Sequence, residues 1–256
     1  MSSPLFYKST ECQEITPSTT AHGGSGSFLP PLKNTPEGDV LLVNKPLGWT
    51  SFDVVKKLRN ILKITKIGHA GTLDPLATGL LIICTGKQTK AISQYQDLDK
   101  VYTGQLVLGK TTPSIDLETA FDSNRPYNQV TEIDIIQLVQ KFLGVITQIP
   151  PAYSAIKTKG VRAYKQARKG LQPALEPRQI VIKDFTITSI NLPEINFKIT
   201  CSKGTYIRSI VRDFGESLGT GAYLAQLCRT HIGTYSLENA CEIEALMRSH
   251  ANSSIG

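Results

Sequence analysis

Asp74 is the only acidic residue between Asp53 and Asp97, a stretch that also contains seven lysines and arginines. Acidic side chains repel phosphates, so a surface that binds RNA should keep one only where another requirement holds it there. An ionised carboxylate in such a place can form a covalent adduct, stabilise a cationic centre or direct the removal of a proton. The alternative role is a helix cap, which composition alone favours, because aspartate before proline often has that role.

The segment around Asp74 favours a chemical role over a helix cap. It reads GHAGTLDPLATGLL over residues 68–81 and contains Gly68, Gly71 and Gly79. Glycine permits close approach of the backbone, and Pro75 stiffens the chain directly after the acid. Because a precisely aimed group needs a rigid frame, the segment favours a chemical role for Asp74.

Two further segments are basic and contain no acid. Residues 135–175 carry seven cations with Tyr153 and Tyr164 among them, and residues 195–212 include a second cluster. The residues of that second cluster are Lys203, Tyr206, Arg208 and Arg212. Cations for phosphates and aromatic rings for bases are typical of proteins that hold structured or unpaired RNA. A surface helix with lysines for solubility is the alternative for the longer segment, but the net charge of +7 also favours a polyanionic partner.

Hydrophobic spacing predicts the elements that position these residues. Apolar runs predict strands at 40–43, 80–85, 100–109, 179–190 and 195–201. Helical spacing predicts three helices: one with Ser51 as N-cap, one that starts with a Thr131–Asp134 capping box and stops at Gly144, and one over 207–218 closed by Gly219. The second helix should bury Ile133, Ile136, Leu138, Val139, Phe142 and Leu143. The chain is therefore expected to be an α+β protein.

Several classes of protein are disfavoured. The five cysteines are scattered and never form a CxxC pair, so neither a disulfide framework nor a zinc site is expected, and a reducing compartment fits best. No Walker loop or GxGxxG turn is present. Without an apolar run long enough for a bilayer or a signal-peptide layout, we expect a cytoplasmic protein. Residues 1–38 are rich in Ser, Thr, Pro and Gly and are expected to form a flexible extension.

Five segments resemble successive motifs of the TruB family of tRNA pseudouridine synthases, which act on the T-loop uridine at position 55. They are NKPLGWTSFDVV (44–55), GHAGTLDPLATGLL (68–81), KVYTGQLVLG (100–109), QIPPAYSAIKTKGVRAYKQARKG (148–170) and CSKGTYIRSIVRDFGESLGTGAYLAQLCRT (201–230). The resemblance implies the pseudouridine synthase fold, with a mixed, largely antiparallel sheet, flanking helices and a central RNA-binding cleft. It also implies that the enzyme binds the T arm of tRNA and needs no metal and no organic cofactor. We expect a monomer.

The resemblance implies roles for individual residues. Asp74 matches the catalytic aspartate, and Arg208 matches the arginine that pairs with it; a phosphate contact is the alternative for Arg208. Lys45 and Pro46 lie in a family motif, and we assign them no chemistry.

The remaining matches concern the nucleotide pocket. Tyr102 matches a tyrosine that stacks on the target base, although an ordinary strand tyrosine is its alternative role. Tyr206 and Leu227 match positions that line the pocket around the flipped nucleotide. His69 matches a histidine that contacts RNA, whereas a lone histidine is more often structural.

The chain also departs from the family pattern. Residues 112–114 read Thr-Pro-Ser where the family commonly has Thr-Asp-Thr, so a contact from that aspartate is absent, although Asp116 remains. Cys228 replaces a basic residue. Many bacterial members continue into a small RNA-binding domain, whereas we expect a catalytic domain at 39–235 and a short C-terminal segment at 236–256.

Three functional classes were compared. A non-catalytic RNA-binding or RNA-folding module on the same scaffold would gain affinity by losing Asp74. A hydrolytic glycosidase usually needs two carboxylates, and Asp74 has no obvious partner in the sequence. Retention of Asp74, Tyr102 and Arg208 together favours an isomerase.

Overall fold

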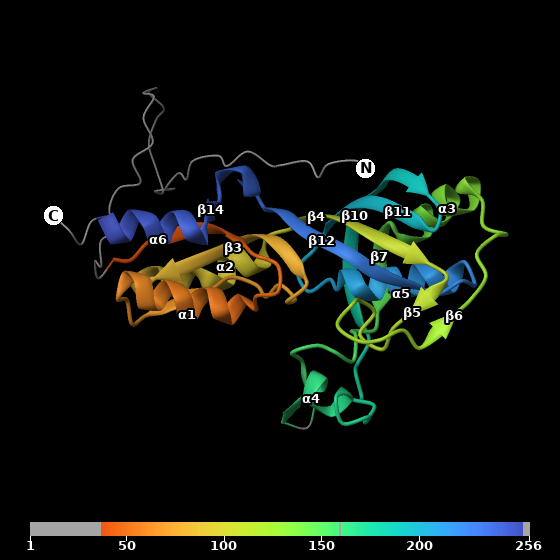
Figure 1. Cartoon of the computed structure of the whole chain (residues 1–256), viewed down its shortest axis with the longest axis horizontal. Coiled ribbons are helices and arrows are strands. Elements are labelled where there is room, and N and C mark those ends of the chain that lie inside the picture. Colours follow the sequence, from red (N-terminus) through yellow and green to blue (C-terminus); the bar gives the residue numbers. More distant parts are fainter. Residues whose placement is uncertain (1–36, 159, 253–256) are drawn as a thin grey trace. The chain divides into compact units, whose positions relative to one another are not determined.

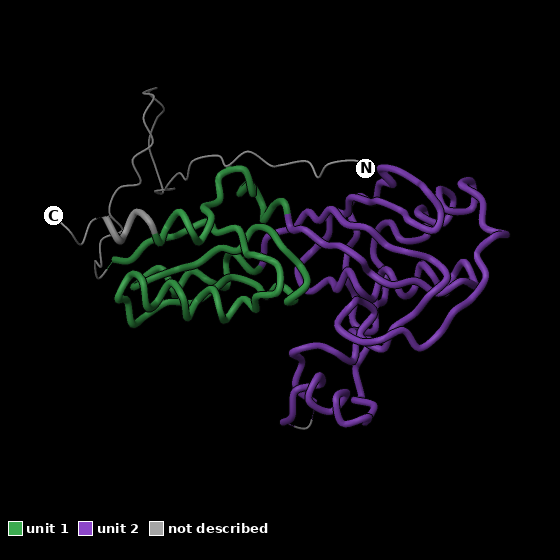
Figure 2. Tube along the Cα trace, viewed as in Figure 1, with its two compact units in different colours: residues 1–96, 230–256 green, residues 97–229 purple. Residues whose placement is uncertain are grey.

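The computed structural model describes residues 37–158 and 160–252, with the backbone alone for residues 248–252 (Figure 1). The extension expected at residues 1–38 lies outside the described residues, apart from Glu37 and Gly38. The chain forms two compact units (Figure 2). Unit 1 comprises residues up to 96 together with those from 230 onward, and unit 2 comprises residues 97–229.

Unit 1 is built on a mixed sheet in which β1 (Val40–Lys45) has a partner on either side. β1 pairs antiparallel with β3 (Ala77–Thr85) and parallel with β14 (Cys241–Glu242), and β2 (Ile67–His69) pairs antiparallel with β3. The other elements are α1 (Ser51–Leu62), η1 (Gly86–Ala91), α2 (Ile92–Asp97), β13 (Tyr235–Ser236), η3 (Leu237–Asn239) and α6 (Ile243–Asn252). The expected C-terminal segment thus contributes β14, and also α6, which packs on α1 and β1.

α1 begins at a capping box, and its N-cap lies one residue before the predicted Ser51. Thr50, not Ser51, is the N-cap: its Oγ1 accepts from Asp53 N at 3.1 Å, and Asp53 Oδ2 accepts from Thr50 N at 2.9 Å. Ser51 is buried in the first turn, so its hydroxyl is available for another contact. Val54 and Leu58 pack into the apolar cluster of the sheet, as their helical spacing predicted.

Unit 2 contains a sheet in the order β12-β4-β11-β10-β7. Its strands are β4 (Lys100–Leu108), β7 (Gly144–Gln148), β10 (Arg178–Asn191), β11 (Glu194–Cys201) and β12 (Ala222–Ile232, of which the part to Arg229 belongs to unit 2). The β4–β11, β11–β10 and β10–β7 pairs are antiparallel. The smaller elements are β5 (Lys110–Thr111), β6 (Ser123–Asn124), α3 (Glu132–Val139), η2 (Gln140–Phe142), β8 (Lys157–Thr158), β9 (Val161–Arg162) and α4 (Ala163–Ala167). The expected α+β class with a largely antiparallel sheet is confirmed.

Four phenylalanines form the core that joins α5 (Ile207–Ser217) to this sheet. Phe214 of α5 lies 5.8 Å from Phe185 and 5.6 Å from Phe142, measured between ring centroids, and Phe185 also contacts Phe197. Such offset contacts between rings stabilise a core beyond the area they bury. They fix the helix that carries Arg208 against the strands behind it.

The face that α3 buries differs from the prediction. The Thr131–Asp134 capping box is present, but Ile133 and Ile136 are 66% and 55% exposed, and Ile135 is buried instead. Ile135, Leu138, Val139 and Phe142 are the buried set, which shares one helical face. Gly144 adopts φ 83° as the first residue of β7, after the 3-10 turn, so it does not itself end the helix.

Two further properties bear on the earlier expectations. Within residues 37–158 and 160–252, no helix is long and apolar enough to span a membrane. Cys84, Cys201 and Cys228 are free thiols. Burial raises the pKa of both Cys84 and Cys201 to about 11, so these two thiols are poor nucleophiles at neutral pH.

Candidate active site

Asp74 lies on the loop between β2 and β3 in unit 1, and its side chain is partly exposed. The residue before it is fixed by α1: Ser51 Oγ accepts from Leu73 N at 2.9 Å and donates to Leu73 O at 3.3 Å. On the other side, the carbonyl oxygen of Asp74 accepts from Ala77 N at 3.1 Å. The residue is therefore partly exposed, while the backbone on either side of its side chain is held in place.

Lys45 provides the second anchor of this loop. Its side chain is 0% exposed, and its ammonium donates to the carbonyl oxygens of Pro46 at 2.9 Å, Trp49 at 2.5 Å and Pro75 at 3.2 Å. Gly48 N also donates to the Pro75 carbonyl, at 2.9 Å. A buried cation that binds several carbonyls ties separate loops together. No role for Lys45 was predicted from the sequence, and the structure gives it this anchoring role.

The glycines of the segment adopt conformations that other residues avoid. Gly71 and Gly79 have φ angles of 93° and 105°, in a region where a side chain would be strained. A Cβ at Gly68 would lie 2.9 Å from Ile92 Cδ1. His69, in β2, is partly exposed and pairs with Ile83 of β3. The rigid frame expected around Asp74 is therefore present.

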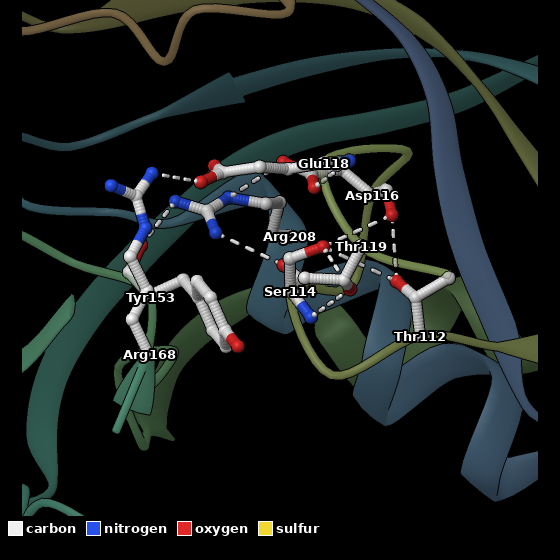
Figure 3. A network of polar contacts seen from close by, with 8 residues as sticks. All are labelled: Thr112, Ser114, Asp116, Glu118, Thr119, Tyr153, Arg168 and Arg208. Atoms are coloured by element: carbon white, nitrogen blue, oxygen red, sulfur yellow. Dashed lines mark hydrogen bonds and ion pairs between the residues drawn. The ribbon is translucent and has the colours of Figure 1, made fainter. Parts of the chain in front are cut away.

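Arg208, in the first turn of α5 in unit 2, is held by main-chain oxygens (Figure 3). Only 3% of the residue is exposed. Its Nη1 donates to Ser114 O at 3.0 Å, and its Nη2 donates to Tyr153 O at 2.9 Å. Asp116 Oδ2 lies 3.7 Å from its Nε. The guanidinium is thus fixed in one orientation.

The loop that holds Arg208 has its own internal network (Figure 3). Thr112 Oγ1 and Ser114 Oγ lie 2.7 and 3.1 Å from the carbonyl oxygen of Asp116, to which they donate. Thr119 Oγ1 accepts from Ser114 N at 3.1 Å. Between them Ile115 adopts φ 66°, which for a β-branched residue costs about 1–3 kcal/mol. This buried network offsets the backbone strain and keeps the loop in a single shape.

A cavity of about 270 Å³ lies beside the same loop. Pro113 and Ile115 form part of its wall, and the Arg125–Glu216 ion pair, at 2.9 Å, forms another part. Pro113 stands where the family commonly has an aspartate, so this departure makes the cavity wall more apolar.

The expected pocket residues lie on three elements of unit 2. Tyr102 is largely buried in β4, where it pairs with Ile199 of β11. Leu227 is partly exposed on β12. Tyr206 is the N-cap residue of α5 and is also partly exposed.

Comparison with known proteins decides the family. A model of the TruB family of pseudouridylate synthases (N-terminal domain) matches residues 59–207. This chain belongs to the TruB family. A tRNA pseudouridine synthase B of Flavobacterium johnsoniae is 53% identical over 214 residues, covering 81% of this chain and 93% of that protein. The protein of the same name from Phocaeicola vulgatus is 48% identical over 218 residues, covering 83% of this chain and 93% of that one.

Solved structures agree with this assignment. The chain matches one in the crystal structure of a Cbf5-Nop10-Gar1 complex with a TM-score of 0.63 and 26% identity, covering 90% of this chain and 65% of that one. It also matches a chain of an H/ACA RNP bound to a substrate RNA containing 2′-deoxyuridine, again with a TM-score of 0.63 and 26% identity. That match covers 84% of this chain and 54% of the other. The predicted pseudouridine synthase fold and the predicted enzyme class, an isomerase, are confirmed.

The TruB site residues divide between the two units. Asp74 and His69 belong to unit 1, whereas Tyr102, Tyr206, Arg208 and Leu227 belong to unit 2. The pairing of Arg208 with Asp74 would join the units, and it stays a prediction. In the described part of the chain, no group of three or more His, Cys, Asp or Glu residues could hold a metal ion.

Proposed function

We propose that this TruB protein converts the T-loop uridine of tRNA, at position 55, to pseudouridine, with Asp74 as the catalytic group. The observation that carries the proposal is a partly exposed aspartate on a loop anchored on one side by Ser51 and on the other by Lys45. Preorganisation of this kind is what a catalytic group needs. The names of its relatives, tRNA pseudouridine synthase B, support tRNA as the substrate.

The reaction explains why one carboxylate is enough. It breaks the N1–C1′ bond of uridine, forms a C5–C1′ bond to the same ribose, and moves one proton from C5 to N1. Atoms and electrons balance without an oxidant or a second substrate, so we propose no cofactor and no metal. Asp74 can form an adduct with the sugar or the base, stabilise a cationic sugar, or direct removal of a sugar proton. In each case it must be ionised.

We assign the remaining roles by chemistry. Arg208 pairs with Asp74 and orients its carboxylate, because a fixed guanidinium makes charge-assisted hydrogen bonds of defined geometry. Tyr102 stacks on the target base, while Tyr206 and Leu227 line the pocket and His69 contacts the RNA. The burial of Arg208 supports pairing within a site over a phosphate contact at the surface.

The segment that runs from β8 to just beyond α4 supports binding to the T arm. Lys157, Arg162, Lys165 and Lys169 are all exposed there, and cations on one segment neutralise RNA phosphates. We propose that the protein acts as a cytoplasmic monomer on the T-arm stem-loop. We also propose that residues 39–235 form the catalytic domain and that residues 236–256 are a short C-terminal segment.

Asp74→Asn tests the catalytic assignment. The variant should lose pseudouridine formation by at least about a thousandfold, as expected when the reacting group is removed. Its dissociation constant for tRNA should stay within about threefold, because the amide keeps the shape of the side chain. The assay uses purified protein, unmodified tRNA and a T-arm hairpin, with pseudouridine mapped along the strand.

Asp184→Asn, which changes an exposed aspartate of β10, is the matched control and should keep full activity. Turnover by Asp74→Asn within tenfold of the parent protein would refute the role of Asp74. Product found only outside the T loop would refute the substrate. Tight binding of tRNA without any product from the parent protein would favour a non-catalytic binding module.

A further inference from the structure

Two residues outside the expected site contact Tyr206: Gln148 binds its backbone and Arg178 lies over its ring. Gln148, at the end of β7, is fully buried, and its amide contacts the Tyr206 backbone twice. Its Oε1 accepts from Tyr206 N at 2.8 Å, and its Nε2 donates to Tyr206 O at 3.1 Å. A side-chain amide that binds both polar groups of one residue imitates a strand partner. It fixes where the backbone of Tyr206 lies.

Arg178 acts on the ring of the same tyrosine. It is the first residue of β10 and lies directly opposite Gln148 in the β7–β10 ladder. Its Cζ lies 4.5 Å from the centroid of the Tyr206 ring. This distance is within the range in which a guanidinium is attracted to the face of an aromatic ring. The backbone contact and the ring contact thus come from neighbouring strands.

The hydrogen bonding of Arg178 shows how much it depends on this ring. Its Nε and Nη2 are shielded from solvent and have no hydrogen-bond partner among the described residues. Shielded donors without a partner are costly and call for an explanation. The face of the Tyr206 ring therefore attracts a guanidinium whose Nε and Nη2 make no hydrogen bond among the described residues.

We infer that Gln148 and Arg178 are positioning residues, which together hold the Tyr206 ring in the orientation that the flipped nucleotide requires. The inference rests on the proposed function, in which Tyr206 lines the nucleotide pocket. Neither residue needs to touch the RNA. Their effect should fall on the chemical step, because a misplaced pocket wall disturbs alignment more than overall binding.

Kinetics on tRNA test this inference. Arg178→Met and Gln148→Met should each lower kcat by about tenfold, with the tRNA dissociation constant within about twofold. Arg178→Lys should recover part of the loss, because an ammonium can also lie over the ring. Gln179→Met changes the exposed neighbour on β10 and should leave kcat unchanged.

A double-mutant cycle separates positioning from an independent role. In a Tyr206→Leu background, Arg178→Met should lower kcat by less than about twofold further, because the ring through which it acts is gone. In a Tyr206→Phe background, which keeps the ring, Arg178→Met should keep its tenfold effect. If Arg178→Met lowered kcat in the Tyr206→Leu background as much as it does in the parent protein, the inference would be overturned.

Salt dependence distinguishes a direct contact with phosphate. If Arg178 bound phosphate, Arg178→Met would reduce the slope of log affinity against log salt by about one, and the positioning role would be wrong. An unchanged slope together with a lower kcat supports it. If Gln148→Met does not fold, as judged by its denaturation curve, the two Arg178 variants carry the test.

A readout without substrate keeps this inference separate from the proposed function. In aromatic NMR spectra, the Tyr206 signals can be assigned by their loss in Tyr206→Phe. They should shift in Arg178→Met and Gln148→Met and stay in place in Gln179→Met. If the parent protein formed no pseudouridine, the proposed function would fail, and these shifts would still decide whether the two residues position the ring. Unshifted Tyr206 signals in both variants would overturn the inference.

Discussion

Replacing Lys45 with methionine removes the ammonium that ties the Asp74 loop to the segment after β1. In the parent protein this ammonium donates to the carbonyl oxygens of Pro46, Trp49 and Pro75. Methionine is one atom shorter than lysine and keeps most of its apolar stem, so packing changes little. The substitution therefore isolates the polar contacts.

The expected loss of stability follows from these contacts. A hydrogen bond to a charged group contributes roughly 1.5–3 kcal/mol, so three would contribute about 4.5–9 kcal/mol if they were additive. Burying the ammonium itself costs several kcal/mol, and methionine does not incur that cost. We expect a net loss of about 3 kcal/mol in the free energy of unfolding, mostly from carbonyls left without a donor.

Urea denaturation of the parent protein and of Lys45→Met measures this loss, as a lower midpoint for the variant at an unchanged slope. Lys56→Met, an exposed position on α1, is the control and should change stability by less than about 0.5 kcal/mol. Under conditions where Lys45→Met is folded, its kcat should also fall, because the Asp74 loop is less constrained. A loss below about 1 kcal/mol, or full kcat in the folded variant, would refute the anchoring role.

Two further predictions concern unit 2. Burial is the main cause that lowers the pKa of Lys100 from 10.5 to about 8, with Arg229 as the next cause. Between these two pH values the unfolded chain binds more protons than the folded one. The stability of the parent protein relative to Lys100→Met should therefore rise by about 1–2 kcal/mol from about pH 8 to about pH 10.5, after screening by water. Urea midpoints of both proteins across this range check the prediction, and a stability difference that does not change with pH would contradict it. In Gly215→Ala the new Cβ would lie 2.3 Å from Ala222 N. We therefore expect the free energy of unfolding to fall by about 2–4 kcal/mol, despite the better helix propensity of alanine. Ser217→Ala on the same helix is the control, and a Gly215→Ala variant more stable than the parent protein would contradict the clash.

The sequence predicted features that depend on neighbours along the chain. The strand at 40–43, the Thr131–Asp134 capping box and the helix that begins after Tyr206 all follow from local spacing and capping chemistry. The choice of Ser51 as N-cap was wrong because serine and threonine are both good caps, and the position of Asp53 three residues after Thr50 decides between them.

Features that depend on distant partners could not be predicted. The buried face of α3 is set by the strands against which Ile135 packs, and exposed Ile133 is equally apolar in the sequence. The role of Gln148 depends on Tyr206, which lies 58 positions further along the chain. For Lys45, the signal that could have found it was a lysine at the end of an apolar strand, where burial requires partners for its charge.

The grip on Arg208 has a consequence for how this family can vary. Two of its partners, at Ser114 and Tyr153, are main-chain oxygens, which every amino acid supplies. Side chains in those segments can therefore change over evolutionary time without loosening the arginine, provided that the path of the backbone is kept. Selection then acts on the backbone conformation of these segments more than on their side chains. This explains how a proline at position 113 is compatible with the hydrogen bonds that hold the Arg208 guanidinium.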